Sequence, residues 1–211
     1  MPQFNYPTFR LIAGHSTLDF VNTLDDRFSE GGGRELLNSY ADLLSFARQA
    51  VVLDAAQVQA LAGREQSTKA ANALRSARDL RESLAVLFYE TLGQTRKQPP
   101  PDMKNLERHF LRADQHRELI WNRTPDDGGA VSRATWRWGV FAADLELPIW
   151  AIAQSSAQLL TSSAMDHVRM CGSETCRWLF HDTSKNHSRR WCDMKICGNR
   201  MKARRFQHRR D

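Results

Sequence analysis

The sequence has 211 residues, of which 41% are hydrophobic and 26% are charged, so the chain can fold around at least one apolar core. Mean hydropathy is −0.56, and the longest apolar stretch, near residues 140–153, is interrupted by Asp144, Glu146 and Pro148. These features exclude a helical membrane protein, and the first residues lack the pattern of a secretory signal, so we expect a cytoplasmic protein.

Helical periodicity and capping residues predict that most of the chain up to about residue 165 is helical. Ser16 with Asp19 resembles a capping box for the first helix, and Ser39 and Asp54 are N-cap candidates for the next two. The prolines at 99–101 are expected to stop a long helix. The predicted helices span residues 15–24, 40–51, 54–63, 67–95, 102–113 and 143–160.

A short β-hairpin interrupts this helical pattern. The runs ELIWNR (118–123) and AVSRATWRW (130–138) are rich in β-prone residues and flank TPDDGG, which contains an Asp-Gly turn signal. The chain is therefore predicted to be mainly α with a small β-hairpin. We expect a helical N-terminal domain at residues 1–165 and a compact C-terminal module at residues 166–211.

Three polar residues, His15, Asp19 and Asn22, lie on or beside the otherwise apolar first predicted helix. They could line a pocket for a small-molecule effector, or they could be a helix cap and buried polar groups with internal partners. The tryptophans at 121, 136, 138 and 150 could line an apolar cavity, although packing is the simpler interpretation. Nucleotide-binding glycine patterns, GxSxG and HExxH do not occur, so we do not expect an enzyme.

The positive charge of the chain is concentrated at its C-terminal end. Residues 1–170 contain 19 Lys and Arg against 20 Asp and Glu, a net charge of −1, whereas residues 171–211 contain 11 against 4, a net charge of +7. A cationic segment of this kind is typical of proteins that bind a polyanion. Nucleic acid is the commonest such partner, and an acidic membrane surface is the second.

All four cysteines lie in this cationic segment, with the spacing Cys171-x4-Cys176-x15-Cys192-x4-Cys197. Two pairs separated by a central stretch can place four thiolates around one tetrahedral ion, so the spacing favours a Zn²⁺ site. Two disulfides, unrelated buried thiols and a redox pair are the alternatives. A cytoplasmic location disfavours the first of these, and the absence of CxxC disfavours the last.

A metal ion would also explain how so short a segment folds. Its sizeable apolar residues, which we expect to form its core, are Trp178, Leu179, Phe180, Trp191, Ile196 and Phe206. Because this is little apolar area for an independent fold, one Zn²⁺ would supply most of the folding free energy, about 10–16 kcal/mol in apparent binding. Four thiolates leave no open coordination position, so we expect the ion to be structural.

The run CRWLFHDTSKNHSRRWCDMKICGNRMKARRF (176–206) resembles the CGNR zinc finger, whose naming motif stands at Cys197-Gly198-Asn199-Arg200. The run TLDFVNTL (17–24) resembles the start of the ABATE domain that commonly precedes this finger. The chain is thus similar to bacterial proteins described as stress-induced transcription regulators. The resemblance implies a small treble-clef-like zinc-binding C-terminal module, DNA binding, and one structural Zn²⁺ held by the four cysteines.

The basic residues form two groups, one in the loop between the cysteine pairs and one after the last cysteine. A helix beginning near Cys197 would present the second group to a DNA groove, although only Ala203 and Phe206 mark an inward stripe. Arginine and lysine would contact phosphates, and asparagine could contact adenine. The predicted nucleic-acid-binding residues are Lys185, Arg189, Arg190, Asn199, Arg200, Lys202, Arg204, Arg205 and Arg209.

Double-stranded DNA is the partner that we expect, bound by a homodimer that forms through the helical domain and contacts paired half-sites. The alternative is an RNA-binding or ribosome-associated zinc protein, in which Trp178, Phe180 and Trp191 stack on unpaired bases. A solvated charged tail without a partner is a further alternative. The neighbouring cysteines and the aromatic residues interleaved with the basic ones count against it.

Overall fold

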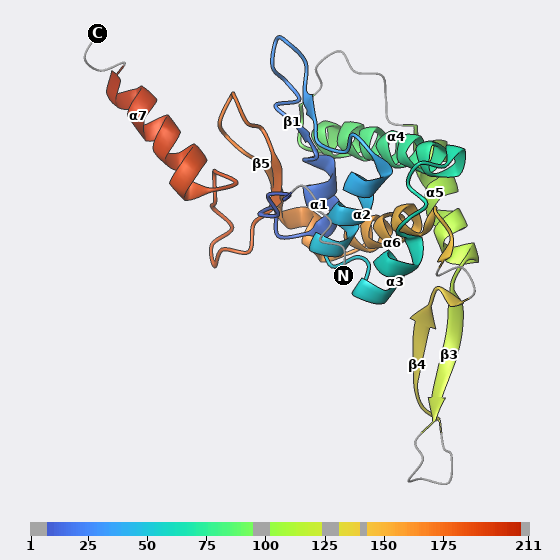
Figure 1. The fold of residues 1–211 in the computed structure, drawn as a ribbon. Helices are drawn as coiled ribbons and strands as arrows, with labels where there is room; N and C mark the ends of the chain where they lie inside the picture. Colours follow the sequence, from blue (N-terminus) through green and yellow to red (C-terminus); the bar gives the residue numbers. More distant parts are fainter. Residues whose placement is uncertain (1–7, 95–101, 124–130, 140–142, 208–211) are drawn as a thin grey trace.

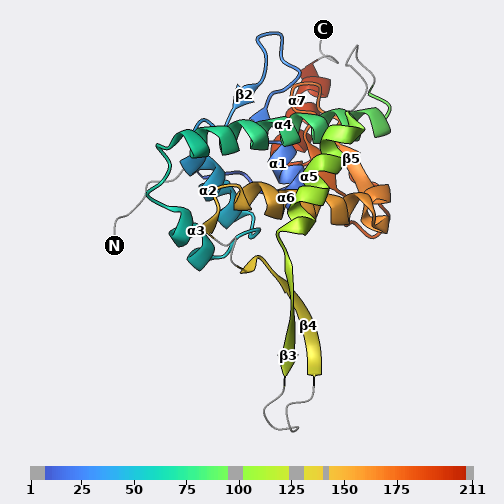
Figure 2. The same cartoon turned by 90° about the vertical axis from the view of Figure 1, so that its right-hand side faces the viewer.

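The structure is a computed structural model that describes residues 8–94, 102–123, 131–139 and 143–207 of the chain. Figures 1 and 2 show a body of packed helices, from which the last helix and a β-hairpin project in different directions. The described helices are α1 (Ser16–Val21), α2 (Tyr40–Gln49), α3 (Ala55–Leu61), α4 (Thr68–Thr91), α5 (Met103–Gln115), α6 (Leu147–Leu160) and α7 (Asn199–Gln207), with short turns η3 (Ser163–His167) and η4 (Met194–Gly198).

The strands pair consecutively into small antiparallel sheets, each of two strands. The pairs are β1 (Leu24–Asp25) with β2 (Arg34–Glu35), β3 (Glu118–Arg123) with β4 (Val131–Arg137), and β5 (Val168–Met170) with β6 (Leu179–His181). The predicted fold class, mainly α with a small β-hairpin, is confirmed. The prolines at 99–101 lie outside the described residues.

Side-chain caps fix where α2 and α3 begin, as the sequence predicts. The Ser39 hydroxyl accepts from the Asp42 N–H at 3.1 Å, and the Asp42 carboxylate accepts from the Ser39 N–H at 2.8 Å. Asp54 and Gln57 form the same reciprocal pair at α3. Each box satisfies backbone donors that the first turn of a helix leaves without a partner, so both starts are well defined.

The capping box predicted for α1 is wrong. The N-cap is His15, whose Nδ1 accepts from a backbone N–H at 3.2 Å, and not Ser16. The Ser16 and Ser155 hydroxyls are hydrogen bonded to each other at 2.8 Å, which links α1 to α6. The Asp19 carboxylate likewise bonds outside the box, to the Ala13 N–H. Contacts with the rest of the body have therefore replaced the local cap.

α6 is the central helix of the body, and it packs against α1, α2, α4 and α5. It begins at Leu147 rather than at the predicted residue 143, with Pro148 in the first turn, where its missing N–H leaves no hydrogen bond unmade. One continuous core of buried apolar side chains joins these helices to β5 and β6. Within the described parts of the chain, we find no helix with the length and apolar character needed to cross a membrane.

The predicted β3–β4 hairpin is confirmed, and it extends from the helical body on the side away from α7 (Figure 1). Trp121, opposite Ala134, is 61% exposed, and Trp136 is 53% exposed, so the packing role predicted for these two residues is wrong. The hairpin projects from the helices, and all the β4 residues from 133 to 137 are exposed. Trp150 is buried, as packing predicts, and its ring stacks on His116 with 3.8 Å between the centroids.

Candidate metal centre and nucleic-acid interface

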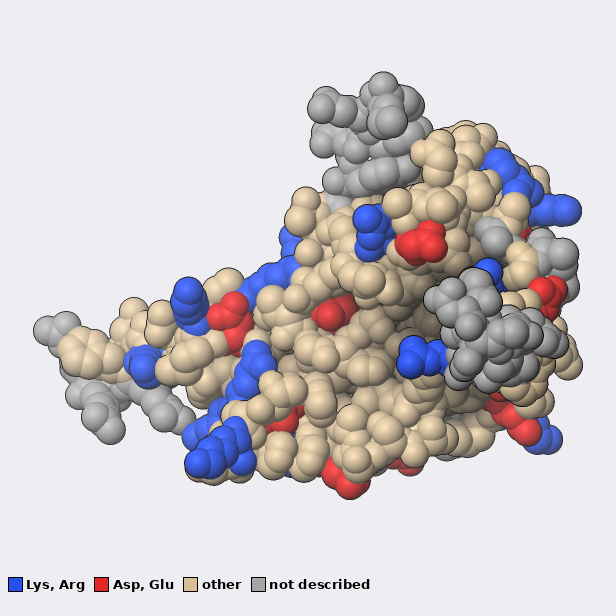
Figure 3. Space-filling model, turned by 90° about the horizontal axis from the view of Figure 1, so that it is seen from below, with Lys and Arg blue, Asp and Glu red and all other residues tan. Residues whose placement is uncertain are grey.

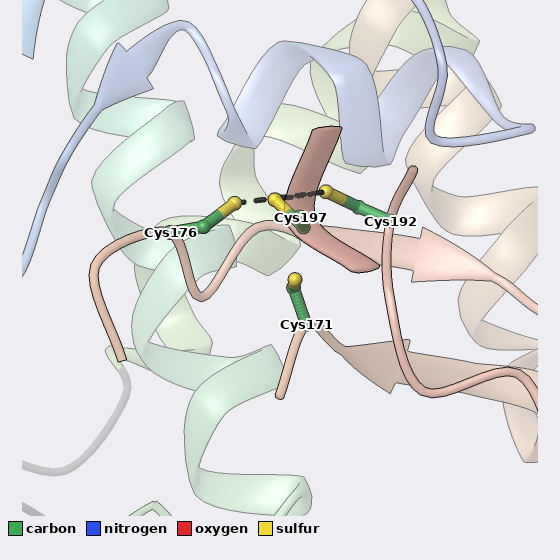
Figure 4. A group of neighbouring side chains, drawn as sticks. All are labelled: Cys171, Cys176, Cys192 and Cys197. Carbon is green, nitrogen blue, oxygen red and sulfur yellow. Dashed lines mark hydrogen bonds between the residues drawn. The ribbon is translucent and has the colours of Figure 1, made fainter. Parts of the chain in front are cut away.

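Four short segments at the C-terminal end bring the cysteine side chains together, with their sulfur atoms turned toward one another (Figure 4). Cys171 follows β5 and Cys176 precedes β6, so the β5–β6 hairpin supplies the first pair. Cys192 comes from the next loop, and Cys197 lies in η4, directly before α7. A hairpin, a loop and a helix with the last cysteine at its start form the treble-clef-like module that the sequence predicts.

The four sulfur atoms are spaced as a tetrahedral ion requires. All lie within 4.8 Å of one another, and the Sγ–Sγ separations are 3.6 Å for Cys176 with Cys192 and 3.7 Å for Cys192 with Cys197. Zn–S bonds of about 2.3 Å define a tetrahedron whose sulfur–sulfur edge is about 3.8 Å. A disulfide requires about 2.05 Å, and all four cysteines are free. The cluster is therefore positioned to bind a metal ion.

Without a cation, the four thiols oppose one another's ionisation. Hydrogen bonds from the Cys176 and Cys192 thiols lower the pKa of Cys171, and hydrogen bonding to Cys171 raises the pKa values of those two. Burial raises the pKa of Cys197. The thiols thus resist ionising together, whereas a central divalent cation favours four thiolates. Such a donor set suits a thiophilic metal ion.

Hydrogen bonds attach this centre to the helical body. The Asn22 side chain, at the end of α1, donates to the Leu179 carbonyl at 2.9 Å and accepts from the Leu179 N–H at 3.0 Å. The His181 N–H donates to the Ala13 carbonyl at 2.7 Å, so β6 is held on both sides of Phe180. Because Leu179 and Phe180 are fully buried in the common core, the helical body fixes the strand that adjoins the metal centre.

The apolar residues of the C-terminal segment do not form a core of their own. Trp178, Leu179 and Phe180 are buried, as the sequence predicts, but in the core shared with the helices. Ile196 and Phe206 are 41% and 63% exposed, so their predicted core role is wrong. Ala203, on the expected inward stripe of α7, is also exposed. The reason is visible in Figure 1, where α7 projects from the body instead of folding back onto it.

Asp182 organises the loop between the cysteine pairs and was not among the predicted functional residues. Its buried carboxylate accepts from the Ser184 N–H, the Ser184 hydroxyl and the Arg189 N–H, at 2.9, 2.6 and 2.8 Å. Burial opposes the ionisation of Asp182, but these hydrogen bonds prevail and lower its pKa to about 2. The available signal was the Asp-x-Ser spacing, which favours a side-chain-to-backbone turn.

The Cys-Gly-Asn-Arg motif forms the junction between the metal centre and α7. The Asn199 side-chain amide donates to the Lys195 carbonyl at 2.9 Å, across the join of η4 and α7. An Arg200 Nη1–H donates to the Thr175 hydroxyl at 3.2 Å, in the turn that holds Cys176. Of these two side chains, predicted as nucleic-acid contacts, Asn199 links α7 to η4 and Arg200 links α7 to the turn of the first cysteine pair.

Arg189 is bound within the module. Its Nε–H donates to the Trp191 carbonyl at 2.8 Å, and an Nη2–H donates to the Cys192 carbonyl. Its guanidinium carbon lies 4.7 Å from the centroid of the Phe180 ring. The structure thus places this predicted nucleic-acid contact against the backbone of a metal ligand, where it supports the loop.

Other cations of the predicted interface are open to solvent. Figure 3 shows Lys and Arg side chains gathered on the narrow end of the molecule, which the finger and α7 form. Arg205 belongs to α7, and Arg209 lies outside the described residues. The predicted nucleic-acid-binding residues that are exposed and make no polar contact with described side chains are Lys185, Arg190, Lys202 and Arg204.

The three residues predicted for an effector pocket have partners inside the protein. His15 caps α1, and both ends of the Asn22 amide are bonded to Leu179. The buried Asp19 carboxylate accepts from the Ala13 N–H at 2.9 Å, and burial raises its pKa to about 6. The geometry therefore gives these side chains a structural role, which is the second of the two interpretations left open by the sequence.

Stacking on unpaired bases requires accessible aromatic rings. Trp178 is 8% exposed, and its Nε1–H donates to the Asp25 carboxylate at 2.8 Å. Phe180 is fully buried, and the guanidinium carbon of Arg190 lies 5.3 Å from the centroid of the half-buried Trp191 ring. Two of the three rings on which the RNA alternative depends are thus occupied by packing.

Two family models match the chain in the order that its sequence resemblance suggests. The first is the ABATE family, described as "Putative stress-induced transcription regulator", which matches residues 14–163. The second is the CGNR zinc finger, which matches residues 167–210 and so includes all four cysteines. No curated protein matches the chain. The metal centre and the projecting basic helix both fall within the second match.

Proposed function

Because this chain belongs to the ABATE family and carries a CGNR zinc finger, we propose that it is a zinc-dependent transcription regulator that binds double-stranded DNA. α7 and the loop between the cysteine pairs are the DNA-contacting elements. The observation that carries the proposal is a projecting cationic helix whose first turn follows directly on a four-cysteine centre (Figure 1).

One structural Zn²⁺ is the ion that we assign to the four cysteines. The tetrahedral spacing, the four sulfur donors and the absence of an open position suit zinc in a structural role. Zn²⁺ with four thiolates carries a net charge of −2, which nearby cations such as Arg189 offset. With the ion bound, Cys197 is fixed, and the first turn of α7 is fixed with it.

The charges of α7 explain why DNA would stabilise it. Arg200 and Arg204 are like charges four residues apart, an arrangement that destabilises an isolated helix. A helix of nine residues is also marginal in water without packing. Phosphate groups along a DNA groove would relieve the repulsion, so binding and ordering of the helix support each other.

Salt dependence of DNA binding tests the proposal. We expect the zinc-loaded chain to bind a duplex with an affinity that falls as salt rises, because each phosphate contact contributes about −0.9 to the slope of log K against log salt. The double variant Lys202→Ala/Arg204→Ala should reduce that slope by about 2 while zinc content stays unchanged. Fluorescence anisotropy at several salt concentrations gives the slope.

The matched control is Lys69→Ala/Arg75→Ala, which removes two exposed cations from the N-terminal half of α4. It should leave the slope unchanged. An equal effect of the two double variants would show that net charge, and not α7, determines binding. Tighter binding to single-stranded RNA than to duplex DNA would support the RNA alternative instead.

A further inference from the structure

A hollow of about 770 Å³ lies between the β1–β2 loop and the zinc finger. Its lining comes from the β1–β2 loop, from the turn that ends in Cys176, and from the first turns of α7. Figures 1 and 2 show the β1–β2 loop and α7 toward the same end of the molecule, away from the β3–β4 hairpin. The volume is in the range of small-molecule sites, which often lie between two structural units.

The side chains around this hollow carry both signs of charge. The β1–β2 loop contributes Asp26 and Glu30, the turn between the first two cysteines contributes Glu174, and α7 contributes Arg200 and Arg204. All five are exposed. Among the described residues, no ion pair joins one of these carboxylates to one of these arginines. Opposite charges that share a hollow without pairing leave room for a ligand between them.

The remaining lining is held by its own contacts. Asp25 pairs with Arg34 at 2.5 Å and accepts from the Trp178 Nε1–H at 2.8 Å, so its charge is already compensated. The Phe28 ring packs edge-on against Tyr89, with 4.9 Å between the centroids, and gives the hollow an apolar patch. Within the described part of the chain, the four cysteines are the one group of three or more His, Cys, Asp or Glu side chains that lie close enough together to hold a metal ion. This argues against a second metal site in the hollow.

We propose that this hollow binds a small bipolar molecule, whose anionic group contacts Arg200 and Arg204 and whose cationic group contacts Asp26, Glu30 and Glu174. A simple anion would pair with the arginines but be repelled by the carboxylates. A simple amine would pair with the carboxylates but be repelled by the arginines. A ligand with both charges satisfies both sets. The bound molecule is an effector, because it occupies Arg204, a residue proposed to contact DNA. This last consequence rests on the proposed function, whereas ligand binding itself does not.

Isothermal titration of the zinc-loaded full-length chain, without DNA, tests the site. The probes are aminobutanoate, aminohexanoate and aminooctanoate, each with its amine on the terminal carbon, and the controls are the matching carboxylates and alkylamines. At least one amino acid of this series should bind about fivefold or more tighter than its controls, because it makes ion pairs at both ends. Binding no tighter than the controls for the whole series would overturn the proposal.

Variants then locate the site. Glu30→Gln and Arg204→Ala should each weaken binding of the best probe about two- to fivefold, as expected for loss of one exposed ion pair. Glu107→Gln, at an exposed position on α5, should have no effect. If the two lining variants bind as tightly as the original chain, the probe is held elsewhere and the proposal fails.

A competition with duplex DNA separates this inference from the proposed function. The best probe should weaken DNA binding by the original chain and lose this effect in Glu30→Gln, which keeps every proposed DNA contact. Probe binding in a chain that does not bind DNA would uphold the site and refute the proposed function. DNA binding that saturating probe leaves unchanged would refute the effector role.

Discussion

Asp19 is a carboxylic acid placed where ionisation is disfavoured. Burial raises its pKa from 3.8 to about 6, although hydrogen bonds from the Ala13 and Ile12 N–H groups oppose the shift. Between these two values the folded chain binds more protons than the unfolded chain. The contribution of Asp19 to the free energy of unfolding therefore falls as pH rises from about 4 to about 6, and it is constant above that range.

The variant Asp19→Asn removes this dependence and keeps an oxygen that can accept from the Ala13 N–H. The difference in unfolding free energy, original chain minus variant, should decrease by an amount on the order of 2–3 kcal/mol between pH 4 and pH 6. Urea denaturation at several pH values measures it. A difference that stays constant across this range would show that Asp19 is charged throughout.

The residues of the metal centre could be predicted from sequence, while those that support it could not. Few functions use four cysteines at this spacing, so the spacing alone indicates that the four cysteines act together as a metal site. Asp182 and Arg189 act through backbone groups brought close by folding of the loop, and their residue types are common in any charged segment. Asn22 was identified as a pocket residue or a buried polar group, but its partner Leu179, far along the chain, could not be predicted.

Local sequence signals predicted the two helices that begin with reciprocal capping boxes, α2 and α3. Ser39 and Asp54 can be recognised as N-caps because both halves of each capping box lie within four residues of sequence. β1 and β2 have two residues each, too few for an alternating pattern, so neither strand was predicted. The end of α1 was misplaced for the same reason, because Leu24 belongs to β1.

The β3–β4 hairpin and α6 differ in how much their tryptophans contribute to stability. Trp121→Ala should cost about 1 kcal/mol or less, because that side chain is 61% exposed. Trp150→Ala should cost about 3–5 kcal/mol, because it leaves a cavity in the core where the ring is 3% exposed. Denaturation of the two variants under one condition compares them. Equal losses of unfolding free energy would mean that Trp121 is buried against another surface in solution.

The finger and the helices share a core, but they depend differently on the metal ion. The amides of Leu179 and His181 donate to Asn22 and Ala13 of the helical body. The amides of Lys195 and Ile196 donate to Asp193, a residue next to a metal ligand, whose link to the rest of the body is an exposed ion pair with Arg10. Loss of the ion should therefore release η4 and α7, while β6 stays docked.

Hydrogen exchange with and without a chelator measures this difference. After chelation, the amides of residues 194–207 should exchange rapidly, and those of Leu179 and His181 should keep their protection. If Leu179 and His181 lost protection together with residues 194–207, the ion would stabilise β6, η4 and α7 as one unit.

The proposed function requires four thiolates to gather one metal ion and so orient α7. Native mass spectrometry of the purified chain tests this requirement, with Cys192→Ser as the comparison. We expect one zinc ion per original chain, protons displaced from the cysteines on binding, and no stoichiometric zinc in the variant. A metal-free chain with its cysteines joined in disulfides, or a variant that retains a full equivalent of zinc, would contradict the account.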